Sequence, residues 1–161
     1  MSFSFFPGVT KAVRFEGPDS RNPLSYRFYQ PGFQVEGKAM EAILQPAICW
    51  WHGLTGEGED PFGGPAHELT WEAKPKNIVG ACKKADAGFE LMEILGIPHF
   101  TFHDLDLAPN GENWGATRRN LDDVATHIER RMKETGKSCL WATQNTFSEP
   151  CFTHGGGTAM H

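Results

Sequence analysis

Hydrophobic residues recur along this chain in two distinct spacings. Short continuous apolar runs are typical of buried strands, whereas an apolar residue every three or four positions is typical of a helix that packs on one face. The strand-like runs are "AICWWH" at 47–52, "HFTFHD" at 99–104 and "SCLWATQN" at 138–145. The helix-like segments are 77–95, which stops at Gly96, and 121–132, which stops before Gly136. The pattern predicts strand, loop and helix twice, followed by a third strand.

Two consecutive strand–loop–helix units predict a parallel sheet, because each helix carries the chain back to start the next strand in the same direction. We therefore expect an α/β fold, as a sheet or a barrel, over residues 46–161. Residues 1–45 are punctuated by Pro and Gly and are predicted to form an N-terminal arm, with one short helix near Val35–Leu44. Three parallel strands leave apolar edges unpaired, so we expect this sequence to be part of a larger fold.

Composition and charge exclude several classes of function. The 161 residues carry a formal charge of −5, and no basic cluster stands apart from acidic neighbours, so we expect no nucleic-acid partner. No segment approaches the roughly 20 apolar residues of a membrane span, and the start lacks a signal-peptide pattern. The four cysteines occur singly and are interpreted as small core residues in a reducing compartment. These features predict a soluble, cytoplasmic protein.

The second strand-like run ends abruptly in ionisable residues. His103 is followed by Asp104 and Asp106, and parallel α/β folds place their sites at the carboxyl ends of strands. A carboxylate three positions after a histidine can fix the tautomer of the imidazole and stabilise its protonated form. His103 with Asp106 is therefore a candidate acid/base pair, and His99 is more simply interpreted as a structural residue.

Two other chemistries are compatible with the same residues. The segment "DLDLA" after an apolar strand is similar to the D-x-D-x-[TV] nucleophile loop of haloacid-dehalogenase-like phosphatases, in which Asp104 would attack phosphorus, although the final position does not match. A transition-metal site built from His99, His103 and Asp106 is a third hypothesis, but the spacing of its histidines suits a helix better than a strand.

A Gly-rich loop, "GLTGEGEDPFGGPA", follows the first strand-like run. It lacks the Lys-Ser/Thr ending of a phosphate-binding P-loop, and its acidic residues would repel a phosphate. We interpret it as a shaped loop that presents Phe62. Among the tryptophans, Trp50 and Trp141 are predicted to be plain core, whereas Trp51 lies near the end of its strand on the other face and could wall a pocket.

Four segments together resemble the xylose isomerase family, in its longer class with an N-terminal arm. They are "VRFEGPDSRNPLSYRFY", "WWHGLTGEGEDPFGG", "KKADAGFELMEILGIPHFTFHDLDLAPNG" and "LWATQNTFSEPCFTHGGGT", in the family's order and spacing. The resemblance implies the N-terminal portion of a (β/α)₈ TIM barrel and the reversible isomerisation of xylose to xylulose or glucose to fructose. It also implies a homotetramer and two divalent cations, Mg²⁺, Mn²⁺ or Co²⁺, that act as Lewis acids during a hydride shift.

Matched by motif, the resemblance makes His103 the ring-opening histidine and Asp106 its orienting partner, and gives Asp104 a structural role. The family's metal ligands and catalytic lysine lie on later strands, so no metal ligand is expected within this chain. An alternative is that the chain is a truncated, non-catalytic fragment or assembly subunit. The implied sugar-binding positions are Trp51, Thr143 and Phe147, with Phe62 reaching into a neighbouring subunit's site.

The chain also departs from the family pattern near its third strand. Ala142 and Gln144 replace small residues of the family's "W-G-T-x-N", and Cys151 replaces the arginine of its Pro-Arg-aromatic motif. These changes concern the geometry of the loop and the contacts between subunits, and they leave the proposed pair untouched.

Overall fold

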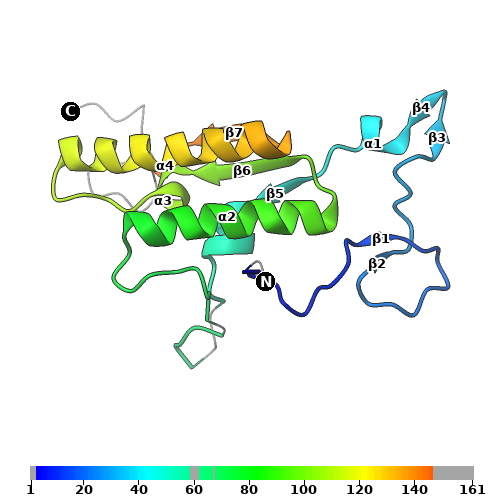
Figure 1. The fold of residues 1–161 in the computed structure, drawn as a ribbon, viewed down its shortest axis with the longest axis horizontal. Helices are drawn as coiled ribbons and strands as arrows, with labels where there is room; N and C mark the ends of the chain where they lie inside the picture. Colours follow the sequence, from blue (N-terminus) through cyan, green and yellow to red (C-terminus); the bar gives the residue numbers. More distant parts are fainter. Residues whose placement is uncertain (1–2, 59–61, 67, 147–161) are drawn as a thin grey trace.

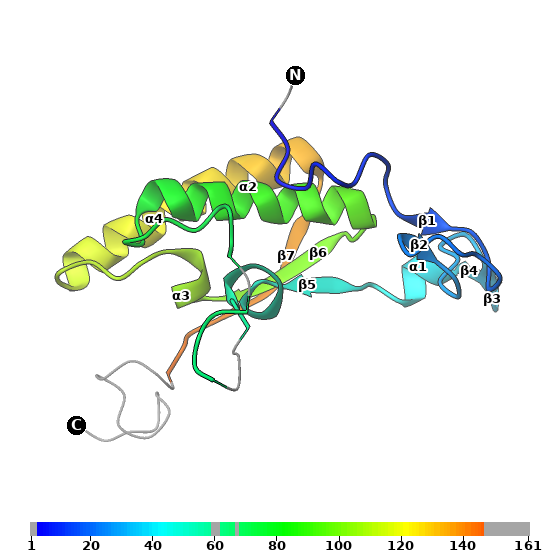
Figure 2. The same ribbon diagram turned by 90° about the horizontal axis from the view of Figure 1, so that it is seen from below.

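A computed structural model describes residues 3–58, 62–66 and 68–146. Its centre is a three-stranded sheet in the order β5-β6-β7, formed by β5 (Ala47–Cys49), β6 (His99–His103) and β7 (Ser138–Thr143). Both strand pairs are parallel, which confirms the direction that the repeated units predict. The helices α2 (Ile78–Leu95) and α4 (Trp114–Thr135) lie side by side over one face of this sheet, as Figures 1 and 2 show.

Local sequence signals set the ends of α2. The side chain of Asn77 accepts a hydrogen bond from the backbone N–H of Gly80 at 3.0 Å, which satisfies one free donor of the first turn. Gly96 ends the helix in the left-handed region at φ 65°. The polar cap and the glycine stop, both legible in the sequence, explain why 77–95 is predicted well as a helix.

Aromatic residues fill the core between the helices and the sheet. Trp50 is 1% exposed and stacks on the fully buried Phe100, with ring centroids 5.0 Å apart. Phe89 of α2 meets the same Phe100 edge-on at 5.6 Å. The prediction that Trp50 belongs to the core is confirmed.

The first strand is shorter than the strand predicted over 47–52. The strand β5 ends at Cys49, and Trp51–Thr55 form a single π-helical turn, η1, in which the backbone N–H of Gly56 donates to the carbonyl of Trp51 at 2.8 Å. The strand ends because the backbone of Trp50 takes right-handed helical angles, φ −66° and ψ −31°. A second short helix, α3 (Asp104–Leu107), replaces the loop expected directly after β6.

The strands and the short helix of the arm lie to one side of the sheet in both views, whereas the chain before them runs beside α2. The helix predicted over Val35–Leu44 is wrong in its first half, because Glu36 and Gly37 take positive φ angles of 49° and 77° and form a tight turn. The helix that does form has only four residues. The elements of the arm are β1 (Arg14–Phe15), β2 (Ser25–Tyr26), β3 (Gln34–Val35), β4 (Lys38–Ala39) and α1 (Met40–Ile43).

Two hydrogen bonds attach the arm to the end of α2. The hydroxyl of Tyr26 donates to the carbonyl of Leu95 at 2.6 Å, and the backbone N–H of Val13 donates to the carbonyl of Ile94 at 2.7 Å. Both acceptors lie in the last turn of the helix, where carbonyls lack partners within the helix. The arm therefore caps the end of α2 that lies opposite the candidate site.

Candidate active site

His103 and Asp106 meet at the carboxyl end of β6. The backbone N–H of His103 donates to Oδ2 of Asp106 at 2.9 Å, and Nδ1 of the same histidine lies 3.2 Å from that oxygen. The two side chains are 12% and 8% exposed, so the contact is largely shielded from water. His103 lies directly before the first residue of α3. The single turn of that helix brings the side chain of Asp106 back to His103.

The contact assigns different roles to the two imidazole nitrogens. A proton on Nδ1 is held by the carboxylate of Asp106, which leaves Nε2 as the atom that can accept or donate a proton. The carboxylate also stabilises the imidazolium that forms when Nε2 takes a proton. The geometry is that of an oriented general base.

Two tryptophan rings stand against the imidazole of His103. Trp51, at the start of η1, meets it edge-on with centroids 4.8 Å apart, and Trp141 of β7 meets it edge-on at 5.9 Å. Trp51 is 42% exposed and Trp141 is 45% exposed, so each ring also presents apolar surface to the outside. Trp51 fits its expected place as a wall, whereas the prediction that Trp141 is plain core is wrong.

Asp104 is held by the backbone. Its Oδ1 accepts hydrogen bonds from the N–H of Leu105 at 2.9 Å and from the N–H of Asn145 at 2.8 Å. The carboxylate thereby ties the beginning of α3 to the segment that follows β7. This arrangement supports the structural role, because both hydrogen bonds to Oδ1 hold the backbone around α3 in place.

The other predicted site positions are Thr143, Phe62 and Phe147. Thr143 pairs with His103 in the register of β6 and β7, so the two residues are neighbours across the sheet. Phe62 lies in the Gly-rich loop with its side chain 98% exposed, and its contact with another subunit remains a prediction. Phe147 lies outside the described residues.

The alternative metal trio does not come together. Nδ1 of His99 lies 2.8 Å from the hydroxyl of Ser138, at the start of β6, about 13 Å along the strand from His103. Among the described residues, no group of three His, Cys, Asp or Glu side chains could hold a metal ion. The described part of the chain therefore offers no fit for the divalent cations that the resemblance implies.

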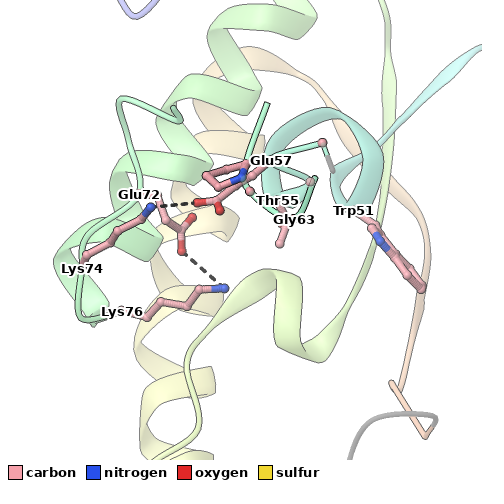
Figure 3. A pocket seen from close by; sticks show the side chains of 11 residues that line it. Trp51, Thr55, Glu57, Gly63, Glu72, Lys74 and Lys76 are labelled. Atoms are coloured by element: carbon pink, nitrogen blue, oxygen red, sulfur yellow. Dashed lines mark ion pairs between the residues drawn. The ribbon is translucent and has the colours of Figure 1, made fainter. Parts of the chain in front are cut away.

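A pocket of about 840 Å³ opens beside Trp51 beneath the Gly-rich loop, and Figure 3 shows its charged residues. Lys74 pairs with Glu57 at 3.3 Å, and Lys76 pairs with Glu72 at 3.6 Å. Each lysine that could attract a phosphate is already balanced by a carboxylate. That this loop is no phosphate cradle stays a prediction, and the pairing of both lysines with carboxylates supports it.

Comparison with known proteins supports the resemblance that the motifs indicate. No family model matches the chain. This chain is 42% identical over 158 residues to xylose isomerase of Geobacillus thermodenitrificans, and the aligned segment covers 98% of this chain and 35% of that protein. This chain is also 42% identical over 161 residues to xylose isomerase of Mesorhizobium japonicum, and the alignment covers 98% of this chain and 36% of that protein. For xylose isomerase of Thermotoga maritima the identity is 41% over 154 residues, with 96% and 34% covered.

The similarity to proteins named xylose isomerase is therefore confirmed along almost the entire chain. The chain spans about a third of the length of these curated relatives. None of the described helices is long and apolar enough to cross a membrane.

Proposed function

We propose that this chain carries the ring-opening part of a xylose isomerase site. The contact of His103 with Asp106, walled by two tryptophans at the carboxyl end of a parallel strand, carries the proposal. The similarity of nearly the whole chain to proteins named xylose isomerase supports it. Residues 1–45 would form the arm, and residues 46–161 the first strands of a (β/α)₈ barrel.

The pair has the chemistry that opening a cyclic aldose requires. Nε2 of His103 takes the proton of the anomeric hydroxyl while the bond between the anomeric carbon and the ring oxygen breaks. The carbonyl forms, and the same proton is returned to the ring oxygen, so the step balances without any further reactant. Asp106 holds Nδ1–H throughout and compensates the charge of the imidazolium.

The walls determine which molecule reaches Nε2. The indoles of Trp51 and Trp141 offer apolar faces suited to the C–H side of a sugar, and the hydroxyl of Thr143 lies on the neighbouring strand. An aldose or ketose substrate is therefore part of the proposal, together with a homotetrameric assembly in which Phe62 would reach a partner's site. The divalent cations would supply Lewis-acid chemistry from ligands outside this chain.

A pair of histidine variants on one strand tests the proposal. His103→Gln removes the proton-accepting nitrogen, and its matched control His99→Gln removes a ring at the other end of β6. We expect His103→Gln to lower kcat for D-xylose by about 100-fold or more in a metal-supplemented complete protein that also carries the later strands. His99→Gln should change it by less than about threefold, because exposed or structural histidines contribute little to the chemistry.

Product can be followed as the ketose by NMR, starting from the cyclic aldose. Equal losses in the two variants would remove His103 from the chemistry. Absence of any aldose–ketose exchange in the complete protein with His103 and Asp106 intact would refute the function itself and favour the alternative of a non-catalytic subunit.

A further inference from the structure

The π-helical turn η1 sets the position of one wall of the site. It begins with Trp51, whose ring lies 4.8 Å from that of His103. Single π-helical turns are rare and are frequently found at functional sites. Whatever holds η1 in place therefore holds the Trp51 ring against the imidazole.

The indole of Trp71 holds this turn at its far end. Its N–H donates to the carbonyl of Leu54 at 2.8 Å, in the last turn of η1, where carbonyls lack a partner within the helix. Leu54 is fully buried and Trp71 is 9% exposed, so water has little access to this carbonyl. A buried carbonyl without a partner is strongly disfavoured. Trp71 therefore provides a bond that the turn needs.

Residues near the N-terminus brace Trp71 from its other side. The rings of Phe5 and Phe6 lie 6.4 Å and 5.8 Å from the Trp71 ring. The backbone N–H groups of Phe5 and Phe6 donate to the carboxylate of Glu90 at 3.0 Å and 3.4 Å, and the hydroxyl of Ser4 donates to it as well. Glu90 belongs to α2, so this clamp fixes residues 4–6 to the same helix on which η1 packs.

We propose that Trp71 is a positioning residue for the candidate site. Through the Leu54 carbonyl it fixes η1, and through η1 it fixes the Trp51 ring against His103, with residues 4–6 as its support. The effect of Trp71 on turnover rests on the proposed function. Its effect on the contact between Trp51 and His103 is independent of that function.

Two identical substitutions separate this role from ordinary core packing. Trp71→Phe removes the indole donor, and Trp50→Phe makes the same truncation at a residue that is 1% exposed and whose indole nitrogen has no hydrogen-bond partner among the described residues. Two readouts apply to the complete protein, which also carries the later strands. One is KM and kcat for D-xylose, and the other is the ¹³C-labelled Cε1 signal of His103, which is sensitive to the ring current of Trp51.

We expect Trp71→Phe to raise KM by about fivefold or more and to change kcat by less than about twofold. A change of about fivefold is at the lower end of the cost of leaving a buried carbonyl without a hydrogen-bond partner. The Cε1 signal of His103 should shift as Trp51 moves. Trp50→Phe should lower stability and leave both KM and the signal near their original values. Glu90→Gln, which weakens the clamp on residues 4–6, should shift the signal in the same direction by a smaller amount.

The inference is overturned if Trp71→Phe leaves KM and the His103 signal unchanged, or if Trp50→Phe moves them equally. If Trp71→Phe does not fold, Glu90→Gln decides, and an unchanged His103 signal in that variant would also overturn it. If the unmodified protein shows no isomerisation, the proposed function fails, and the His103 signal alone still tests the role of Trp71.

Discussion

A buried ion pair beneath the Gly-rich loop allows a quantitative test of the structure. Nζ of Lys84, on α2, lies 3.8 Å from Oε2 of Glu72, and the side chains are 5% and 9% exposed. At an effective dielectric constant near 20, two unit charges at this separation attract by about 4 kcal/mol. Lys84→Met removes that attraction and leaves Glu72 with only Lys76, which is exposed and 3.6 Å from its other oxygen. We expect a loss of about 3 kcal/mol in the free energy of unfolding.

The double variant Lys84→Met/Glu72→Gln is the matched control. It removes both charges, so no uncompensated carboxylate remains, and its free energy of unfolding should lie within about 1 kcal/mol of the parent. Urea denaturation followed by tryptophan fluorescence at pH 7 measures all three proteins. A single variant that costs less than about 0.5 kcal/mol, as a surface substitution does, would refute the buried pair. So would a double variant that costs as much as the single one.

The pH dependence of the same comparison has a definite sign. Burial lowers the pKa of Lys84 below 10.5, and the opposing attraction of Glu72 only partly offsets the effect. Below 10.5 the unfolded chain then binds more protons at this site than the folded chain, so the contribution of Lys84 to stability rises with pH. The parent should gain stability relative to the double variant as the pH is raised toward 10.5. A relative loss over that range would contradict the assigned burial.

Two further predictions concern packing and thiol chemistry. A Cβ on Gly88 would lie 2.8 Å from Cδ1 of Leu54, so Gly88→Ala should lower the free energy of unfolding by about 1–3 kcal/mol in a urea titration, and an unchanged midpoint would contradict the close approach of η1 to α2. Burial, followed by the charge of Asp86, raises the pKa of the Cys82 thiol, and burial raises that of Cys139. Both should therefore react with iodoacetamide at pH 8 more slowly than free cysteine, as mass spectrometry can follow, and equal rates would count against their burial.

The elements that the sequence predicts best are those whose signals are local and repeated. The helix α2 carries its own cap at Asn77 and its own stop at Gly96, and the burial of its apolar face follows from spacing alone. The pairing of His103 with Asp106 is equally local, because three positions at a strand end bring the side chains together through one turn of helix. Family resemblance was needed only to choose among the chemistries that such a pair can perform.

Elements that depend on distant contacts were predicted poorly. The π-helical turn η1 has no periodic signature in five residues, and the hydrogen bond that completes it comes from Trp71, more than a dozen positions away. The helix expected over Val35–Leu44 does not form in its first half, because the turn at Glu36 and Gly37 overrides the helical spacing of the apolar residues. The burial of Lys84 has no signal in the sequence, because a lysine in an otherwise apolar helical stripe normally lies at the surface.

The error over Trp141 has a single structural cause, and that cause also builds the site. The register of β6 and β7 shifts between Phe100 and Thr101, which pair with Cys139 and Trp141, so one residue of β7 is left without a partner. In an unbroken register, Trp141 would pair with Phe102 and share its core-facing side. The bulge moves Trp141 to the opposite face, the face of His103.

The same shift selects the neighbour of the imidazole on the next strand. It places Thr143, with its hydroxyl, beside His103 in the position that Ala142 would otherwise hold. Strand alternation read from the sequence assumes an unbroken register, so by itself it would place Trp141 on the wrong face. A bulge next to a candidate acid/base pair re-aims side chains toward that pair, and here one extra residue supplies both an aromatic wall and a hydroxyl.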